Sequence, residues 1–171
     1  MSWIGFEADI FALLDITPFS WRAIGTALFC GAVIGCERQV RGKPVGIRTS
    51  ALITVGTYLF LACALLLQGE TSDPTRVLGQ VVTGIGFLGA GVMLSKNGAV
   101  IGVTSAAAIW ILAALGVLIS MDHLMPAIKL SLLVVLILCG VEFLENRLRV
   151  LTRGVHQKID RTFGRSERTK L

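Results

Sequence analysis

The chain is short of charged residues and of residues that interrupt helices. Only 16% of its 171 residues are Asp, Glu, Lys or Arg, and only four are proline. A soluble domain usually has about a quarter of its residues charged. Hydrophobic residues make up 54% of the chain and cluster in stretches of roughly 17 to 22 residues, the length that crosses a hydrocarbon core about 30 Å thick. The sequence predicts an all-α, polytopic membrane helix bundle.

Residues that carry chemistry are equally scarce. The two histidines, His123 and His156, are far apart in the chain, and the four cysteines lie in or beside apolar runs without a CxxC motif. We find no Ser/His/Asp or Cys/His grouping, no metal-ligand spacing and no GxxxxGK[ST] phosphate loop. We therefore predict no enzymatic activity, no cofactor and no metal site. Because the chain has no phosphate loop, it cannot act alone as an ATP-driven pump.

Five transmembrane helices are predicted, over residues 17–36, 49–67, 74–94, 104–120 and 126–144. Together they form a five-helix membrane domain over residues 17–145. Residues 1–16 have an apolar half interrupted by Glu7, which predicts a helix in the membrane interface or, alternatively, a frayed terminus. Residues 146–171 form a basic cytoplasmic tail, either a helix along the anionic leaflet or a disordered arm.

The distribution of Lys and Arg predicts the orientation. Thirteen of the 16 fall in the segments on one side of these spans, and three (Arg22, Arg76 and Lys129) fall on the other side. Basic loops stay in the cytoplasm. The N-terminus is therefore predicted outside and the C-terminus in the cytoplasm, in the bacterial inner membrane. Since topology accounts for the net charge of +5, no nucleic acid is expected as a partner.

The segment 37–50, ERQVRGKPVGIRTS, holds four cations and one acid between two apolar runs. With the N-termini of the helices predicted to begin at Thr49 and Thr104, it offers a positive surface for a phosphate, a lipid headgroup or an acidic partner segment. Glu37 is expected to pair with one of the arginines. The alternative is that these charges only enforce topology. The candidate site comprises Glu37, Arg38, Arg41, Lys43, Arg48, Thr49, Lys96 and Thr104.

Small residues indicate where helices approach one another closely. Ala23, Ala27, Gly31 and Gly35 repeat every four residues in the first span. The third span has small residues on two faces, and we predict that it lies at the centre of the bundle. A helix broken at its glycines, which lines a cavity, is the alternative. Its GIGFLGAGV run lacks the strand and acid of a dinucleotide-binding loop. The predicted packing glycines are Gly31, Gly35, Gly79, Gly84, Gly86, Gly89 and Gly91.

Two similar segments each open a span that returns outward. GIRTSA begins at Gly46 and GVTSAA begins at Gly102, and each follows a span that starts with Thr-Pro or Asp-Pro. The pattern suggests two hairpins in the same orientation, with a fifth helix appended. Chance similarity among small residues is the alternative.

The segments ERQVRGKPVGIRTSAL and VVTGIGFLGAGVMLSKNGAVIGVTSAAAIWILAALG resemble the MgtC/SapB family of bacterial inner-membrane proteins over roughly residues 31 to 120. That family usually reads closer to ER-x-x-RGK-x-AGLRTH and GLTTAA-x-W. This chain has Val45 in place of the alanine, Ser50 in place of the histidine and VTS at 103–105 in place of LTT. Many members continue into a soluble C-terminal domain, and we interpret this chain as the membrane domain only.

The resemblance implies a role in adaptation to low magnesium and in virulence, exerted on other membrane proteins, including the ATP synthase. We therefore predict a regulatory protein that associates with other inner-membrane proteins in the lipid bilayer. A homo-oligomer is compatible with this prediction. A transporter or channel for Mg²⁺ or another cation is the alternative. A Mg²⁺ path would require hard oxygen ligands inside the membrane, and the predicted spans carry acids only at their inner ends, at Glu37 and Glu142.

Overall fold

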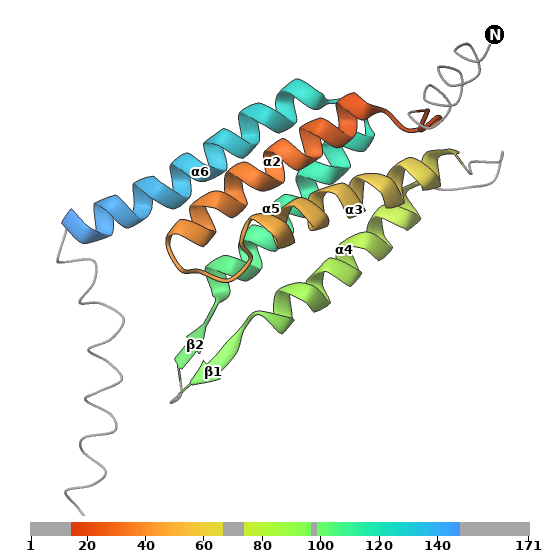
Figure 1. The fold of residues 1–171 in the computed structure, drawn as a ribbon. Coiled ribbons are helices and arrows are strands. Elements are labelled where there is room, and N and C mark those ends of the chain that lie inside the picture. Colours follow the sequence, from red (N-terminus) through yellow and green to blue (C-terminus); the bar gives the residue numbers. More distant parts are fainter. Residues whose placement is uncertain (1–14, 67–73, 97–98, 148–171) are drawn as a thin grey trace, which may run out of the picture. The chain divides into compact units, whose positions relative to one another are not determined.

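The computed structural model describes residues 15–66, 74–96 and 99–147. This part of the chain folds into five helices and one short hairpin (Figure 1). Contacts divide the chain into two compact units, Met1–Leu133 and Val134–Leu171. The elements are α2 (Trp21–Val40), α3 (Ile47–Leu66), α4 (Pro74–Gly91), β1 (Leu94–Lys96), β2 (Ala99–Ile101), α5 (Val103–Ser120) and α6 (Leu124–Arg147).

The helices confirm the predicted membrane architecture. Three of those described, α3, α5 and α6, are long and apolar enough to cross a membrane. Helix α2 carries a charged pair near its end, and α4 is shorter and rich in glycine. Residues 1–14 of the predicted interfacial segment lie outside the described residues. So do residues 148–171 of the predicted basic tail. The orientation across the membrane stays a prediction.

The first helix begins later than predicted. Thr17 and Pro18 precede it, and α2 starts at Trp21 with Ser20 as its N-cap residue. Instead of capping the helix, the amide and hydroxyl of Thr17 both donate hydrogen bonds to Asp15 Oδ1. These bonds favour the carboxylate and keep the pKa of Asp15 below its usual value. The Ser20 amide donates to Tyr58 Oη over 3.2 Å, which ties the start of α2 to α3.

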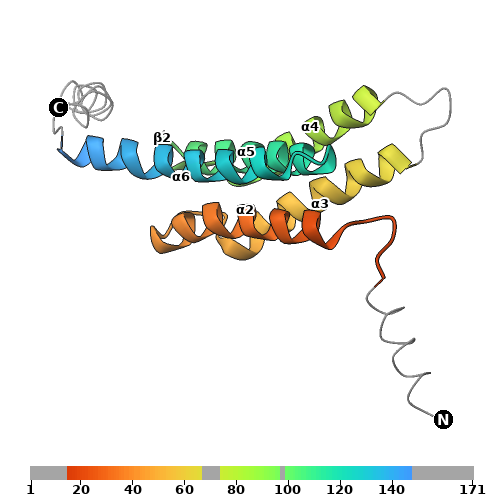
Figure 2. The ribbon, with the colours of Figure 1, turned by 90° about the horizontal axis from the view of Figure 1, so that it is seen from above.

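Helices α2 and α3 lie side by side in both ribbon views (Figures 1 and 2). A Cβ added to Gly31 would stand 2.6 Å from the Ala51 Cα, and one added to Gly35 would stand 2.5 Å from the Ile47 Cα. No side chain larger than hydrogen fits at either place, so the two backbones are in direct contact. Ala23 and Ala27, earlier on the same stripe, are buried as well.

The most enclosed helix of the first unit is α5. It packs against α3, α4 and α2, and 44% of it is buried, against 28% of α3. Gly116 allows the close approach to α3, because a Cβ there would stand 2.7 Å from the Thr54 carbonyl oxygen. The sequence placed the third span at the centre of the bundle, and this was wrong for the single chain: among the α4 residues whose burial is described, only Ile85 and Gly89 are buried. Leucine and isoleucine side chains on α5, rather than glycines on α4, fill the core.

The predicted loop at 95–103 contains an antiparallel hairpin. Leu94 pairs with Ile101 and Ser95 pairs with Val100, with residues 97 and 98 outside the described part. Gly102 then turns the chain into α5 with φ of 91°, a left-handed conformation that suits glycine. A Cβ at Gly102 would also collide with the Val92 carbonyl oxygen.

The two similar segments of the predicted repeat occupy matching places. Gly46 directly precedes α3 and Gly102 directly precedes α5. Ser50 and Ser105, four and three residues further on, are both buried. The chain therefore contains two helical hairpins, α2–α3 and α4–α5, and α3 packs against α5.

Candidate functional site

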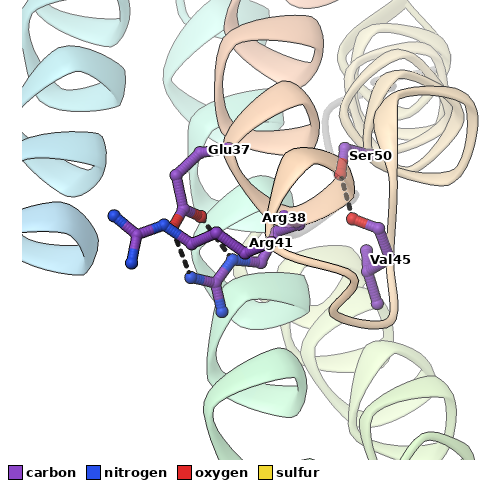
Figure 3. Close-up of polar contacts among 5 residues, drawn as sticks. All are labelled: Glu37, Arg38, Arg41, Val45 and Ser50. Carbon is purple, nitrogen blue, oxygen red and sulfur yellow. Dashed lines mark hydrogen bonds and ion pairs between the residues drawn. The ribbon is translucent and has the colours of Figure 1, made fainter. Parts of the chain in front are cut away.

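The charged end of α2 is organised around a single carboxylate. Glu37 Oε2 accepts a hydrogen bond of 2.5 Å from Arg38 Nε, and Oε1 accepts one of 2.7 Å from Arg38 Nη2 (Figure 3). Arg41 Nε lies 2.8 Å from Glu37 Oε1, one helical turn further on. The prediction that Glu37 pairs with an arginine is confirmed, and the carboxylate serves two of them.

This charge cluster is enclosed by protein. The side chains of Glu37 and Arg38 are 5% and 3% exposed, whereas that of Arg41 is 25% exposed. Charges withdrawn from water need close partners and complete hydrogen bonding, which the two-pronged contact of Arg38 supplies. Arg38 is therefore committed to the fold. Its predicted role in binding a partner or an anion stays a prediction.

The second residue after α2 has a left-handed conformation. Gly42 has φ of 63°, and its amide donates to the Gln39 carbonyl over 3.1 Å. The Lys43 amide donates to the Arg38 carbonyl over 2.9 Å, which closes the end of the helix. The Lys43 side chain is exposed.

A residue that the sequence interpretation missed positions the start of α3. The Ile47 amide donates to Gln39 Oε1 over 3.2 Å, so a side chain on α2 satisfies the first free amide of α3. Gln39 precedes Ile47 by eight residues, which matches no local capping pattern. No signal in the sequence pointed to this contact.

Val45 and Ser50, two of the places where this chain departs from the family pattern, contact each other. Val45 has φ of 69°, an uncommon conformation for a β-branched residue. Ser50 Oγ donates to the Val45 carbonyl oxygen over 3.1 Å, and Ser50 is fully buried (Figure 3). The serine hydroxyl thus holds the turn that leads into α3.

The other predicted site residues lie on three separate elements. Arg48 and Thr49 are exposed on the first turn of α3, which begins at Ile47 rather than at Thr49. Thr104 is exposed on the first turn of α5, which begins one residue earlier than predicted. Lys96 is the last residue of β1. Contacts in the structure join Glu37, Arg38 and Arg41 at the end of α2. Lys43 lies in the loop that follows, and Arg48 and Thr49 lie on the first turn of the next helix, α3.

The predicted packing glycines divide into two groups. Gly31 and Gly35 lie against the α3 backbone, and a Cβ added to Gly89 would stand 3.8 Å from the Ala106 Cβ. The other four, Gly79, Gly84, Gly86 and Gly91, have no atom of the described chain within 4 Å of an added Cβ. Glycine content alone therefore did not tell which faces of α4 are covered.

The described residues contain no group of three His, Cys, Asp or Glu side chains that could hold a metal ion. Helices α3, α4 and α5 have no acidic residue at all. The site is therefore a cationic surface supported by one buried carboxylate. Such a surface can attract anions and acidic segments, and it offers no set of hard oxygen ligands for a dehydrated divalent cation.

The fold and site define a polytopic helical membrane protein with a structured basic segment at one end of its first hairpin. Comparison with known proteins agrees: a family model described as the MgtC family matches residues 24–147. The chain belongs to the MgtC family.

Three relatives illustrate the similarity. YhiD of Escherichia coli K12, whose name describes a candidate magnesium transporter, is 39% identical over 148 residues, covering 82% of this chain and 67% of YhiD. MgtC of Brucella abortus is 46% identical over 92 residues, covering 54% of this chain and 38% of that protein. MgtC of Salmonella typhimurium is 34% identical over 134 residues, covering 78% and 52%. No solved structure matches significantly.

Proposed function

We propose that the chain is a small regulatory protein of the bacterial inner membrane, that it takes part in magnesium handling, and that it acts by associating with other membrane proteins. The contact surface is the segment 37–50, which faces the cytoplasm in the predicted orientation. The magnesium role is supported by the family and by the name of YhiD. The mode of action is supported by the geometry of the segment.

The observation that carries this proposal is the buried ion pair of Glu37 with Arg38. It fixes the end of α2 and leaves two exposed cations, Lys43 and Arg48, on the segment that follows. A positive surface held in one conformation loses little entropy when it binds an acidic partner. Unpaired charges that served topology alone would not require this support.

Cation transport is the second candidate, favoured by the name of YhiD. The acidic residues in the described helices are Glu37 in α2 and Glu142 and Glu145 in α6, all within the last turns of their helices. Glu37 is already neutralised by two arginines. Because Mg²⁺ sheds its waters reluctantly and prefers carboxylate and carbonyl oxygens, this composition supports regulation over transport.

The test replaces both exposed cations, Lys43→Gln together with Arg48→Gln, in the full chain. Growth in low magnesium should fall to the level of a strain without the protein, and affinity capture in mild detergent should lose partners such as the ATP synthase, which the family resemblance suggests. Arg22→Gln, at the other end of α2, is the matched control and should behave as the parent chain.

Normal growth and unchanged capture by the double variant would contradict the proposal. Magnesium flux in proteoliposomes that contain the purified chain alone would establish transport in place of regulation. Membrane levels of each variant must be measured in parallel, so that a loss of insertion is not read as a loss of function.

A further inference from the structure

An apolar groove of about 660 Å³ runs between α3 and α4. Its α3 wall extends from Arg48 to Phe60, and its α4 wall extends from Val77 to Leu88. Since α3 and α4 are consecutive antiparallel helices (Figure 1), Arg48 lies toward the Leu88 end and Phe60 toward the Val77 end. Gly56 and Gly84 line the middle, and both are open to an added side chain.

The length of this groove matches one leaflet of a bilayer. Twelve residues separate Arg48 from Phe60, which is roughly 18 Å along a helix. The hydrocarbon core is about 30 Å thick, so one acyl chain reaches roughly 15 Å from its headgroup region to the midplane. The groove is therefore long enough for a single chain that starts at Arg48.

The groove has one charged lining residue, and this residue lies at its end. Arg48 forms no ion pair within the described part of the chain, whereas Arg38 and Arg41 are both bound to Glu37. Arg48 also belongs to the first turn of α3, where free backbone amides and the helix dipole favour an anion. A cation at the end of an apolar channel complements a molecule with an anionic head and a hydrocarbon tail.

We propose that the α3–α4 groove binds one anionic phospholipid, with its phosphate at Arg48 and one acyl chain along Gly56 and Gly84. A helix of a second copy suits the space less well. Helices α3, α4 and α5 of a second copy carry no acidic residue that could pair with Arg48. The proposal goes beyond the regulatory function and does not depend on it, because the lipid site needs no protein partner.

Native mass spectrometry of the purified full chain tests this proposal. The protein is delipidated and then mixed with equal amounts of phosphatidylglycerol and phosphatidylcholine of the same chain length. The parent chain should retain phosphatidylglycerol several-fold in excess. Arg48→Gln should abolish the excess, whereas Lys43→Gln, which removes a nearby charge outside the groove, should preserve it.

Two further pairs of variants test the acyl channel. Gly84→Leu fills the groove and should reduce the retention of both lipids. Gly86→Leu adds the same side chain to α4 outside the groove and should have no effect, since both glycines are open to an added Cβ. Gly56→Leu should repeat the result from the α3 side.

Equal retention of the two lipids by the parent chain would overturn the proposal. So would an equal loss of selectivity in Lys43→Gln, because the attraction would then be diffuse. A dimer that takes up no added lipid and dissociates in Gly84→Leu would assign the groove to a second copy. Because Arg48 also belongs to the proposed contact surface, Lys43→Gln alone separates the two proposals: it should weaken growth and capture and preserve the lipid selectivity.

Discussion

The hairpins α2–α3 and α4–α5 lead into their second helices through similar sequences, but they pack differently. In the first hairpin the backbones of α2 and α3 are in direct contact at Gly31 and Gly35. In the second, an apolar groove of about 400 Å³, lined by residues such as Trp110 and Val81, lies between α4 and α5. A Cβ added to Gly89 would stand 3.8 Å from the Ala106 Cβ, which is ordinary van der Waals contact.

The spacing of small residues therefore matters more for close packing than their number. Those on α2 recur every four residues and form one continuous seam. Those on α4 lie at intervals of five, two, three and two residues, which distributes them around the helix. One seam gives a close helix pair, and scattered glycines leave α4 open on several sides.

The largest expected difference between the hairpins lies at the charged end of the first one. Glu37→Gln should destabilise the protein by about 3–5 kcal/mol, because it leaves the Arg38 guanidinium buried without a counter-ion. Arg41→Gln should cost much less, since Arg41 is partly exposed and Glu37 keeps its other partner. Thermal unfolding in detergent measures both. Equal losses would show that the burial of Arg38 is not the cause.

A second test reverses in sign between the two hairpins. Gly35→Ala should destabilise the protein by roughly 1–3 kcal/mol, because its methyl group would meet the Ile47 backbone. Gly86→Ala should instead stabilise it by up to about 1 kcal/mol, since alanine is the better helix former and nothing obstructs the methyl group. Unfolding curves of the two variants decide the matter. Destabilisation by Gly86→Ala would mean that another molecule covers this face.

A third and smaller effect concerns the turns before α3 and α5. Ser50→Ala removes the hydrogen bond to the Val45 carbonyl and should cost about 1 kcal/mol. Ser105→Ala in the second hairpin should cost less, because the chain before α5 is held by the β1–β2 ladder. Proteolysis at the loop 41–46 offers a direct readout. Unchanged cleavage in Ser50→Ala would show that the loop does not need the serine.

Much of the candidate site was accessible from sequence because its signals are local. A basic segment between two apolar runs, and an acid within a helical turn of two arginines, can be read from the order of residues. The participation of Gln39 could not be, since an amide that caps a helix eight residues away depends on the path of the loop. The burial of Arg38 was missed for a related reason: which face of a helix is buried depends on the neighbouring helices that pack against it.

By itself, the sequence determined that the chain is a helical membrane protein, where its helices lie to within a few residues, and that Gly31 and Gly35 share one face with Ala23 and Ala27. These properties follow from apolar length and from helical periodicity. Only the tertiary structure decided that α5 is more enclosed than α4, and which glycines touch protein. Packing between helices depends on the shapes of both surfaces at once, and one helix read alone contains only half of that information.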